Sequence, residues 1–107
     1  MEENMIRVTV SYPPHEAFQF DHGYYQNTHA RLIRDRLGPH GLVKLEIDQA
    51  LPGGSENPPA SIAAAHMFFD DLGSFQAAMA AEGKALSADR TNYTDIIPVV
   101  VISQVIQ

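Results

Sequence analysis

The spacing of apolar residues changes twice along this chain of 107 residues, from a repeat of two to a helical repeat of three or four. Alternation over residues 5–12 predicts a strand with one buried face, and a helical repeat follows over residues 22–37. Further strands are expected at 41–51, 60–69 and 96–106, with a second helix over 72–86. This order predicts a ferredoxin-like α+β fold, in which four antiparallel strands carry both helices on one face.

The ends of these elements are marked by residues that cap or interrupt regular structure. Asp21 suits the N-cap of the first helix, because its carboxylate can accept hydrogen bonds from the first free amides. The pair Gly38-Pro39 stops that helix, and Asp70 or Asp71 caps the second. Two segments are expected to be loops or polar connections: residues 52–59 and 87–95.

Composition limits the class of protein. A chain of this length forms one domain, residues 1–107, and it contains no cysteine, so neither a disulfide scaffold nor a thiolate metal site is available. The net charge of −6 argues against a nucleic-acid partner, because nucleic acids select basic surfaces. No apolar run reaches the roughly 18 residues needed to cross a bilayer, and no secretory signal is visible. A cytoplasmic location without a membrane partner is the default expectation.

Two polar rings interrupt the apolar face of the first helix. At about 100° per residue, five side chains share this face: Tyr25, His29, Leu32, Ile33 and Arg36. His29 is a candidate general acid/base, because an imidazole titrates near neutral pH; the alternative is a core histidine bonded to a carbonyl. Tyr25 either orients a substrate oxygen or fills the core. We expect a pocket between the sheet and the first helix, lined by Tyr25, His29, Ile33 and residues of the last two strands.

Further candidates lie outside this helix. His66 shares one face of the third strand with Ala64 and Phe68, and the small neighbours leave room for a ligand or for a closely packed helix. Asp21, Asp89 and Asp95 each lie near the end of an element, where capping or turn chemistry also explains an aspartate. Asp95 enters the last strand, so its carboxylate is a candidate for orienting an imidazole.

Five histidines invite a metal-site interpretation, which their spacing does not support. His22 and His29 lie about 10 Å apart along a helix, and one ion with bonds of about 2 Å cannot bridge them. The sequence contains no His-Glu-x-x-His motif, no glycine-rich phosphate loop before a helix and no serine elbow. Neither a metal nor another cofactor is therefore expected.

The predicted sheet has one face without helices, and that face still carries valine, isoleucine and alanine side chains. Such a face seldom stays exposed in a monomer. A two-fold homodimer that packs sheet against sheet is the economical solution. The space between sheet and helices in each protomer is then the natural pocket for a small-molecule ligand.

Three segments together resemble one known family. They are Phe20-Asp21-x-x-Tyr24-Tyr25-x-x-Thr28-His29-x-x-Leu32, then Phe68-Phe69-Asp70-Asp71 with Phe75-Gln76-Ala77-Ala78, and finally Ala88-Asp89-x-x-Asn92-Tyr93-Thr94-Asp95-x-x-Pro98. They span nearly the whole chain, and in this order they resemble the EthD-like family. The resemblance implies a ferredoxin-like protomer in a dimeric α+β barrel. It carries over these site candidates: Asp21, Tyr25, His29 and Asp95, with Phe68 and Tyr93 of the same segments expected to contact substrate.

Relatives in that superfamily include cofactor-free monooxygenases of aromatic polyketides, muconolactone isomerases and enzymes that act on haem or chlorite. EthD-like members are associated with degradation of ethers and other xenobiotics. The resemblance therefore implies a cofactor-independent enzyme, monooxygenase-like or isomerase-like, acting on a small, mostly apolar molecule that bears oxygen. His29 would move the proton, and Tyr25 or Asp95 would position the reacting group. The alternative is a non-catalytic protein that binds such a molecule, since fold alone does not transmit activity.

Overall fold

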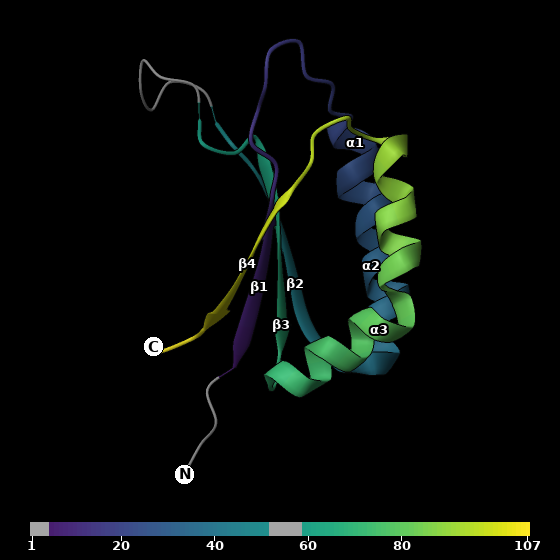
Figure 1. Ribbon diagram of the computed structural model, residues 1–107, viewed down its shortest axis with the longest axis vertical. Helices are drawn as coiled ribbons and strands as arrows, with labels where there is room; N and C mark the ends of the chain where they lie inside the picture. The colour runs from purple at the N-terminus through teal and green to yellow at the C-terminus, as the bar shows by residue number, and fades with distance from the viewer. Residues whose placement is uncertain (1–4, 52–58) are drawn as a thin grey trace.

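The computed structural model describes residues 5–51 and 59–107 as two layers, a four-stranded sheet and helices packed on one of its faces (Figure 1). The strands are β1 (Ile6–Ser11), β2 (Leu42–Gln49), β3 (Ala63–Phe69) and β4 (Val99–Gln104). The first helical stretch consists of α1 (His22–Tyr24), η1 (Tyr25–His29) and α2 (Ala30–Leu37), and the second is α3 (Leu72–Asp89). Two short 3-10 turns follow them, η2 (Gly38–His40) and η3 (Arg90–Asn92).

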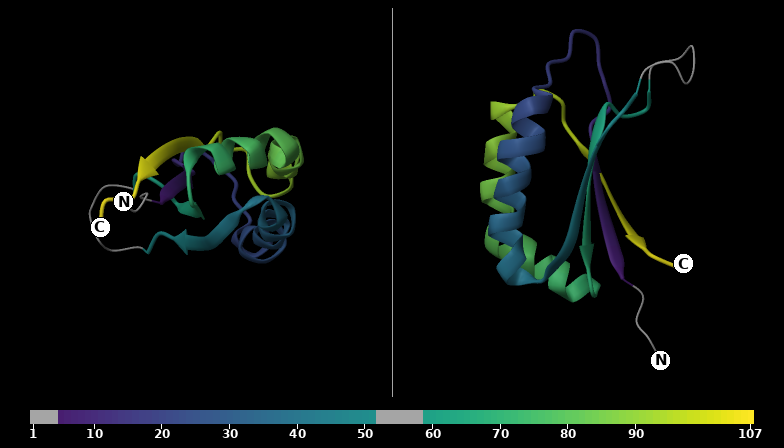
Figure 2. Two further views of the ribbon diagram at one scale, coloured as in Figure 1. Left: turned by 90° about the horizontal axis from the view of Figure 1, so that it is seen from below. Right: turned by 180° about the vertical axis from the view of Figure 1, so that it is seen from behind.

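The sheet has the strand order β2-β3-β1-β4, and every neighbouring pair is antiparallel. The strands that precede the helices, β1 and β3, therefore lie in the centre, and the strands that follow the helices form the two edges. Figure 2 shows both helical stretches on the same side of the sheet. The expected ferredoxin-like fold is confirmed.

The strands alternate between a helix-facing side and an open side. On the helix-facing side, Val8 of β1 lies between Met67 of β3 and Ile102 of β4. On the open side, the adjacent Thr9 lies between His66 and Val101. This alternation decides which residues of each strand can reach a site beneath the helices.

A bulge changes the alternation at the start of β2. The register shifts between Leu42 and Lys44, so Val43 has no partner of its own on β3. Leu42 packs against the core, whereas Val43, which the sequence pattern places on the buried face, is 53% exposed. A bulge adds one residue to a strand, so the side chains before it point to the face opposite the one that strict alternation predicts. This explains why Leu42, and not Val43, faces the core.

Several expected elements have different ends in the structure. β4 begins at Val99 because Ile96 turns into the core, where it is 1% exposed, and Pro98 cannot donate to a strand ladder. The second helix continues through Asp89, although the sequence predicts a polar connection from residue 87 onward. The loop expected at residues 52–59 lies, except for Pro59, outside the described residues.

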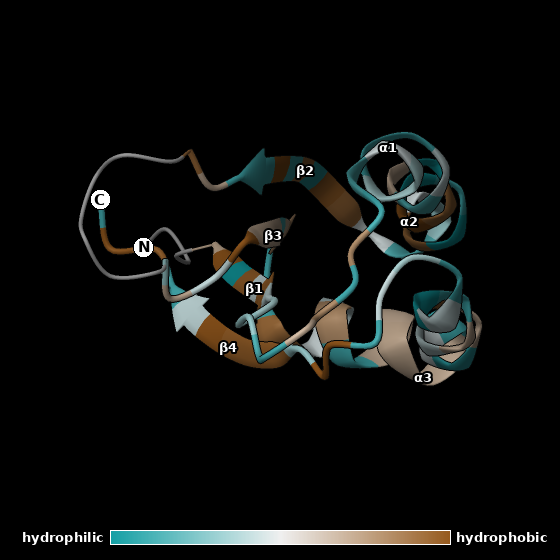
Figure 3. Cartoon of the chain, turned by 90° about the horizontal axis from the view of Figure 1, so that it is seen from above, coloured by the Kyte–Doolittle hydropathy of each residue, from teal (hydrophilic) through white to brown (hydrophobic). Residues whose placement is uncertain are grey.

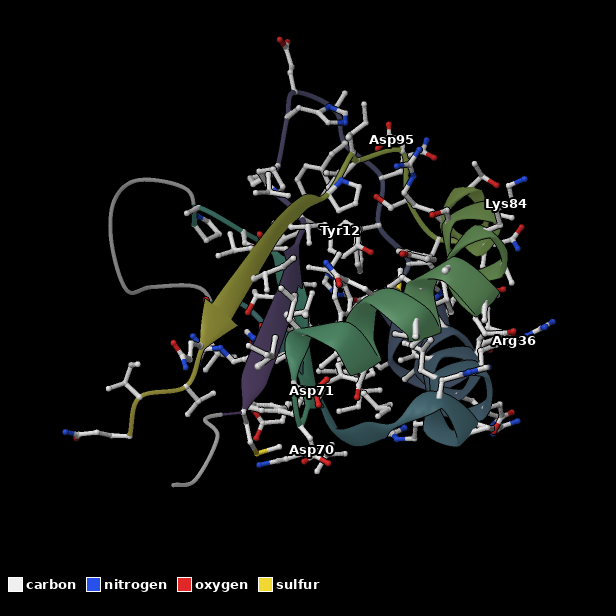
Figure 4. The ribbon with its side chains drawn as sticks, turned by 60° about the horizontal axis from the view of Figure 1, so that its bottom comes forward. Tyr12, Arg36, Asp70, Asp71, Lys84 and Asp95 are labelled. Atoms are coloured by element: carbon white, nitrogen blue, oxygen red, sulfur yellow. The ribbon has the colours of Figure 1, made fainter. Side chains whose placement is uncertain are left out.

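The first helical stretch contains a π-helical turn, η1, which carries Tyr25 and His29. The amide of Ala30 donates to the carbonyl of Tyr25, so this turn holds one more residue than an α-turn. The extra residue rotates the later side chains about the helix axis. The helix therefore buries Ala30, Ile33 and Leu37. Arg36, which a regular helix would place on the inner face, instead extends away from the sheet (Figure 4).

Aspartates cap both helical stretches, as the sequence predicts. The Asp21 carboxylate accepts a hydrogen bond from the amide of Tyr24 at 3.0 Å, and the Asp71 carboxylate accepts one from the amide of Ser74 at 2.7 Å. Gly41 has a φ of 102°, a left-handed conformation that favours glycine, and it turns the chain from η2 into β2. These local interactions fix where each helix begins and where the first returns to the sheet.

The open face of the sheet is more polar than the sequence pattern predicts. Its rows include charged and hydroxyl-bearing side chains: Arg7, Thr9, Lys44, Glu46, Asp48 and His66. The edge strand β4 is the most hydrophobic strand in Figure 3, and its Val99, Val100, Val101 and Ile102 are each about half exposed. On the open side, the expected valine and alanine side chains are present as Val99, Val101 and Ala64, whereas Val100 and Ile102 face the helices.

Candidate functional site

A cleft of about 140 Å³ opens between the helix-facing side of the sheet and the two helices. Apolar side chains form most of its wall: Val10, Ile33, Ala65, Met67, Met79, Leu86, Pro98 and Val100. Six polar side chains complete it: Tyr12, Tyr25, His29, Ser87, Arg90 and Tyr93. An engineered apolar cavity of about 150 Å³ holds benzene, so this cleft suits a ligand built on one ring.

His29 lies in the wall of the cleft between a carboxylate and a phenol. Its Nδ1 is 2.8 Å from the Oδ2 of Asp89, and its Nε2 is 3.5 Å from the hydroxyl of Tyr93. Because an ionised carboxylate can only accept, the proton of the neutral ring is assigned to Nδ1. Nε2 then carries the lone pair that a general base requires, and in the free protein it faces the Tyr93 hydroxyl in the wall of the cleft.

The ring of His29 is held by packing as well as by hydrogen bonds. It lies nearly parallel to the ring of Tyr25, with 5.5 Å between centroids and 14° between planes, and 4.6 Å from the ring of Tyr93. The residue is only 5% exposed. The π-helical turn produces this stacking, because both stacked residues belong to η1.

Asp89 ends α3 and accepts hydrogen bonds from three side chains. Its Oδ1 accepts from the Tyr24 hydroxyl at 2.6 Å and from the Asn92 amide at 2.9 Å, while its Oδ2 accepts from His29. Burial raises the pKa of this carboxyl, but the hydrogen bonds from Tyr24, His29 and Asn92 outweigh burial, so the pKa of Asp89 is lowered. The carboxylate is therefore ionised at neutral pH and would stabilise a protonated His29.

Three buried tyrosine hydroxyls extend this arrangement toward β1. The hydroxyls of Tyr12 and Tyr93 are 2.5 Å apart, which continues the line from Asp89 through His29. Burial raises the pKa of Tyr12, Tyr25 and Tyr93, so all three are protonated at neutral pH. The Tyr25 hydroxyl has no partner of good hydrogen-bond geometry among the described residues, but it interacts with the Tyr12 hydroxyl, which contributes to the raised pKa of Tyr25. Its oxygen is covered by protein atoms.

The structure brings four of the sequence-predicted residues together around the cleft: Tyr25, His29, Ile33 and Tyr93. Asp95 is not among them. It lies in the loop near the top of Figure 4, where its carboxylate accepts from the Gln19 amide at 3.0 Å and lies 3.3 Å from the Nε2 of His15. Asp95 does not reach His29, because Asp89 occupies that position; it instead contacts the imidazole of His15 and fixes the loop before α1.

Asp21 is also away from the cleft. Its carboxylate caps α1, and the residue lines a separate surface depression with Asn92, Thr94 and Asp95. Its amide donates to the carbonyl of Tyr93 at 2.8 Å. The expected contact between Asp21 and substrate is therefore corrected to a positioning role: Asp21 fixes the start of the helix that carries Tyr25.

His66 and Phe68 lie on the open side of β3, on the opposite face of the sheet from the cleft. The Nδ1 of His66 is 3.0 Å from the Thr9 hydroxyl, and its Nε2 is 2.7 Å from the Oδ2 of Asp48. Neither residue can contact a ligand held by His29, so their expected place in that site is corrected. Alternation along β3 puts Ala65 and Met67 in the wall instead.

Sequence reasoning missed the parts played by Asp89, Tyr12 and Arg90. The sequence pattern places Asp89 and Arg90 in a polar connection, where a turn explains both residues. Because α3 extends to Asp89, its carboxylate instead reaches the neighbouring helix. The alternation of β1 does place Tyr12 on the buried face, which is a correct signal, but nothing in the spacing connects it to Tyr93.

Within residues 5–51 and 59–107, no group of three or more His, Asp or Glu side chains is arranged to hold a metal ion. In the same residues, no helix is long and apolar enough to cross a membrane. The polar groups that line the cleft are one imidazole, three phenols, one hydroxyl and one guanidinium.

The sequence and the fold are similar to those of known proteins. A model described as the EthD domain matches residues 13–97, which include Tyr25, His29, Asp89 and Tyr93. The structure is similar to an EthD-like protein from Ralstonia eutropha, with 38% identity and a TM-score of 0.89 over 98% of this chain and 95% of that chain. It is also similar to an ethyl tert-butyl ether D (EthD) family protein from Bacillus halodurans, with 26% identity and a TM-score of 0.73 over 95% and 99% of the two chains.

A dimeric protein with a ferredoxin-like fold from Bacteroides fragilis shares the fold at 11% identity, with a TM-score of 0.62 over 98% of this chain and 100% of that chain. No curated protein matches the chain.

Proposed function

The chain belongs to the EthD family, and from this membership and the geometry of the cleft we propose that it is an enzyme that moves a proton on a small cyclic molecule bearing oxygen. The line of hydrogen bonds from Asp89 through His29 to Tyr93 carries the proposal. An inward imidazole held by a carboxylate is the arrangement used for general acid/base catalysis.

In the proposed step, the ligand takes the place of the Tyr93 hydroxyl at the Nε2 of His29, and this nitrogen accepts a proton from an acidic C–H or O–H group of the ligand. The electron pair of the broken bond remains on the ligand as an enolate or phenolate. The resulting imidazolium is stabilised by the Asp89 carboxylate, which lies 2.8 Å from its Nδ1. The same nitrogen can return the proton to a second position, which completes an isomerisation. Attack of dioxygen on an enolate would begin with the same proton transfer.

Tyr25 is suited to hold the ligand oxygen during this step. Tyr25 lines the cleft and its raised pKa keeps its hydroxyl protonated; the hydroxyl is covered in the free protein, so a small rotation of the side chain would present it to the ligand. A donor that points at an oxygen where negative charge develops lowers the barrier. The apolar wall formed by residues such as Ile33 and Met67 would hold the ring of the ligand.

The proposal is tested by deuterium exchange, which requires no knowledge of the final product. The purified protein is incubated in D2O with a panel of one-ring ketones and lactones, and the signals of their acidic C–H groups are followed by proton NMR. At least one compound should exchange faster than in buffer. His29→Gln should slow that exchange by about 10²–10⁴-fold, the usual contribution of a general base.

His40→Gln is the matched control, because His40 is an exposed histidine in η2 that does not line the cleft. It should leave the exchange rate unchanged. If His29→Gln exchanges as fast as the unmodified protein, His29 is structural. If no compound exchanges although compounds bind, the protein is a binding protein of the kind that the sequence also allows.

The proposed assembly is a homodimer in which a second copy covers the open face of the sheet and β4. Val99 and Val101 on the open side of β4 are each about half exposed. The same face carries charged side chains of both signs, Arg7 on β1 and Glu46 and Asp48 on β2, so two copies related by a two-fold axis can pair opposite charges. The neighbour from Bacteroides fragilis is described as dimeric, which supports a dimer but does not identify the face that forms it.

Sedimentation measures this assembly directly. The protein should sediment as a dimer at micromolar concentration and neutral pH, and Val101→Glu should convert it to a monomer. Ala77→Glu adds the same charge at an exposed position of α3 on the other side of the sheet and should leave the dimer intact. A monomer for the unmodified protein would refute the assembly.

A further inference from the structure

Arg90 brings a formal positive charge to a cleft that is otherwise uncharged when His29 is neutral. It opens η3, immediately after Asp89, and its side chain is half-buried. In the described residues it makes no ion pair, although the chain as a whole carries a net charge of −6. A cation at the edge of an apolar cleft in an acidic protein is therefore available to a ligand.

Arg90 lines the cleft together with Tyr12, and its positive charge opposes the rise in the Tyr12 pKa that burial causes. Ser87 lies one turn earlier on the same side of α3 and also lines the cleft. Arg90 and Ser87 thus contribute two polar side chains, a guanidinium and a hydroxyl, to the wall of the cleft.

The ordinary reason for an arginine at this position is to neutralise the carbonyls at the end of a helix. Here the backbone already serves that purpose. The amide of Arg90 donates to the carbonyl of Ser87, and the carbonyl of Arg90 accepts from the amides of Tyr93 and Thr94. No hydrogen bond from the Arg90 side chain occurs within the described parts of the chain, so the end of α3 does not occupy it.

We infer that Arg90 selects the ligand of this cleft, and that the ligand is a small one-ring carboxylate. The planar fork of a guanidinium matches the two oxygens of a carboxylate, and the Ser87 hydroxyl can add a third donor. The cleft of about 140 Å³ has room for the ring but not for a large polar headgroup. The carboxylate would lie at the half-exposed edge, with the ring against Ile33 and Met67 and beside His29.

This inference rests on the proposed function for its statement that the ligand is a substrate, but the binding preference can be tested alone. The probes are benzoate and its neutral isostere benzamide, titrated into isotopically labelled protein and followed by NMR chemical shifts of cleft residues. The unmodified protein should bind benzoate at least tenfold more tightly than benzamide. Arg90→Gln should weaken benzoate binding by about ten- to a hundredfold, as expected for a charge-assisted pair, and change benzamide binding by less than about threefold.

Three further variants make the result specific. Arg34→Gln removes the same charge from an exposed position of α2 and should leave both affinities unchanged. Arg90→Lys keeps the charge without the planar fork and should retain only part of the preference. His29→Gln should keep the preference for benzoate, which excludes attraction by a protonated imidazole.

Equal affinity of the unmodified protein for benzoate and benzamide would overturn the inference, as would a preference that survives Arg90→Gln or a failure to bind benzoate at millimolar concentration. A preference for benzoate without deuterium exchange of any compound would instead refute the proposed chemistry alone.

Discussion

Replacing Asp89 with asparagine should move the proton of the neutral His29 ring from Nδ1 to Nε2, while keeping a side chain of the same size at position 89. The two oxygens of Asp89 have different partners: Oδ1 accepts from Tyr24 and Asn92, and Oδ2 accepts from the Nδ1 of His29. In Asp89→Asn the amide oxygen must remain on the side of the two donors, so the amide NH2 faces His29. An NH2 group needs an acceptor, which forces the ring proton from Nδ1 to Nε2.

The size of the effect follows from this geometry. With its proton on Nε2, His29 offers the cleft a donor and can no longer accept a proton there. The same reversal in a serine protease lowers kcat by about 10⁴-fold, so we expect a loss of about 10²–10⁴-fold in exchange rate. The three hydrogen bonds also lose their charge assistance. With the Asp89 side chain 13% exposed, we expect a loss of about 2 kcal/mol in stability, or a Tm lower by about 8–16 °C.

Nitrogen NMR of the histidine rings tests the reversal in the free protein, because the chemical shifts of Nδ1 and Nε2 show which nitrogen is protonated. Asp35→Asn, at an exposed position of α2, is the matched control and should change neither the tautomer nor the Tm. The fold lowers the pKa of Asp89, so its contribution to stability is present above the unfolded pKa of about 3.9 and is lost as the pH falls through the folded value. The difference in Tm should therefore shrink in acid. An unchanged tautomer in Asp89→Asn would refute the reasoning.

Two other changes test the cleft and the helix. Tyr25→Phe removes a buried hydroxyl that has no partner of good hydrogen-bond geometry among the described residues, so Tm should rise or stay unchanged. The same variant should weaken the binding of any compound found to exchange. A lower Tm, measured by calorimetry, would show that the hydroxyl is hydrogen-bonded in the folded protein. Leu37→Ala, at a position with 0% exposure, should cost about 2–5 kcal/mol in denaturant unfolding. Val43→Ala, at the half-exposed bulge, should cost less than about 0.5 kcal/mol, and equal costs for the two variants would contradict the facing of these side chains.

Local patterns in the sequence were sufficient to predict the ferredoxin-like fold. Alternation along β1 and the helical repeat after Asp21 fix the types of element, because each depends on residues two to four positions apart. The aspartate caps and the Gly38-Pro39 stop depend on neighbours just as close. The exact facing within the first helix was not predictable in this way. One extra residue in the η1 turn, which no periodicity shows, moved Arg36 outward and Leu37 inward.

The sequence by itself determined the order of strands and helices along the chain and the inward placement of Tyr25 and His29, since these follow from local spacing, and its motifs carried the family resemblance. Only the tertiary structure decided which carboxylate meets His29. Asp89 and Asp95 are near each other in the chain, but α3 continues just far enough to bring Asp89 to 2.8 Å from the imidazole. The pleat of β3 likewise turned His66 away from the cleft. Contacts between residues 60 or more positions apart depend on where elements end and pack, and the hydrophobic pattern carries no information about that.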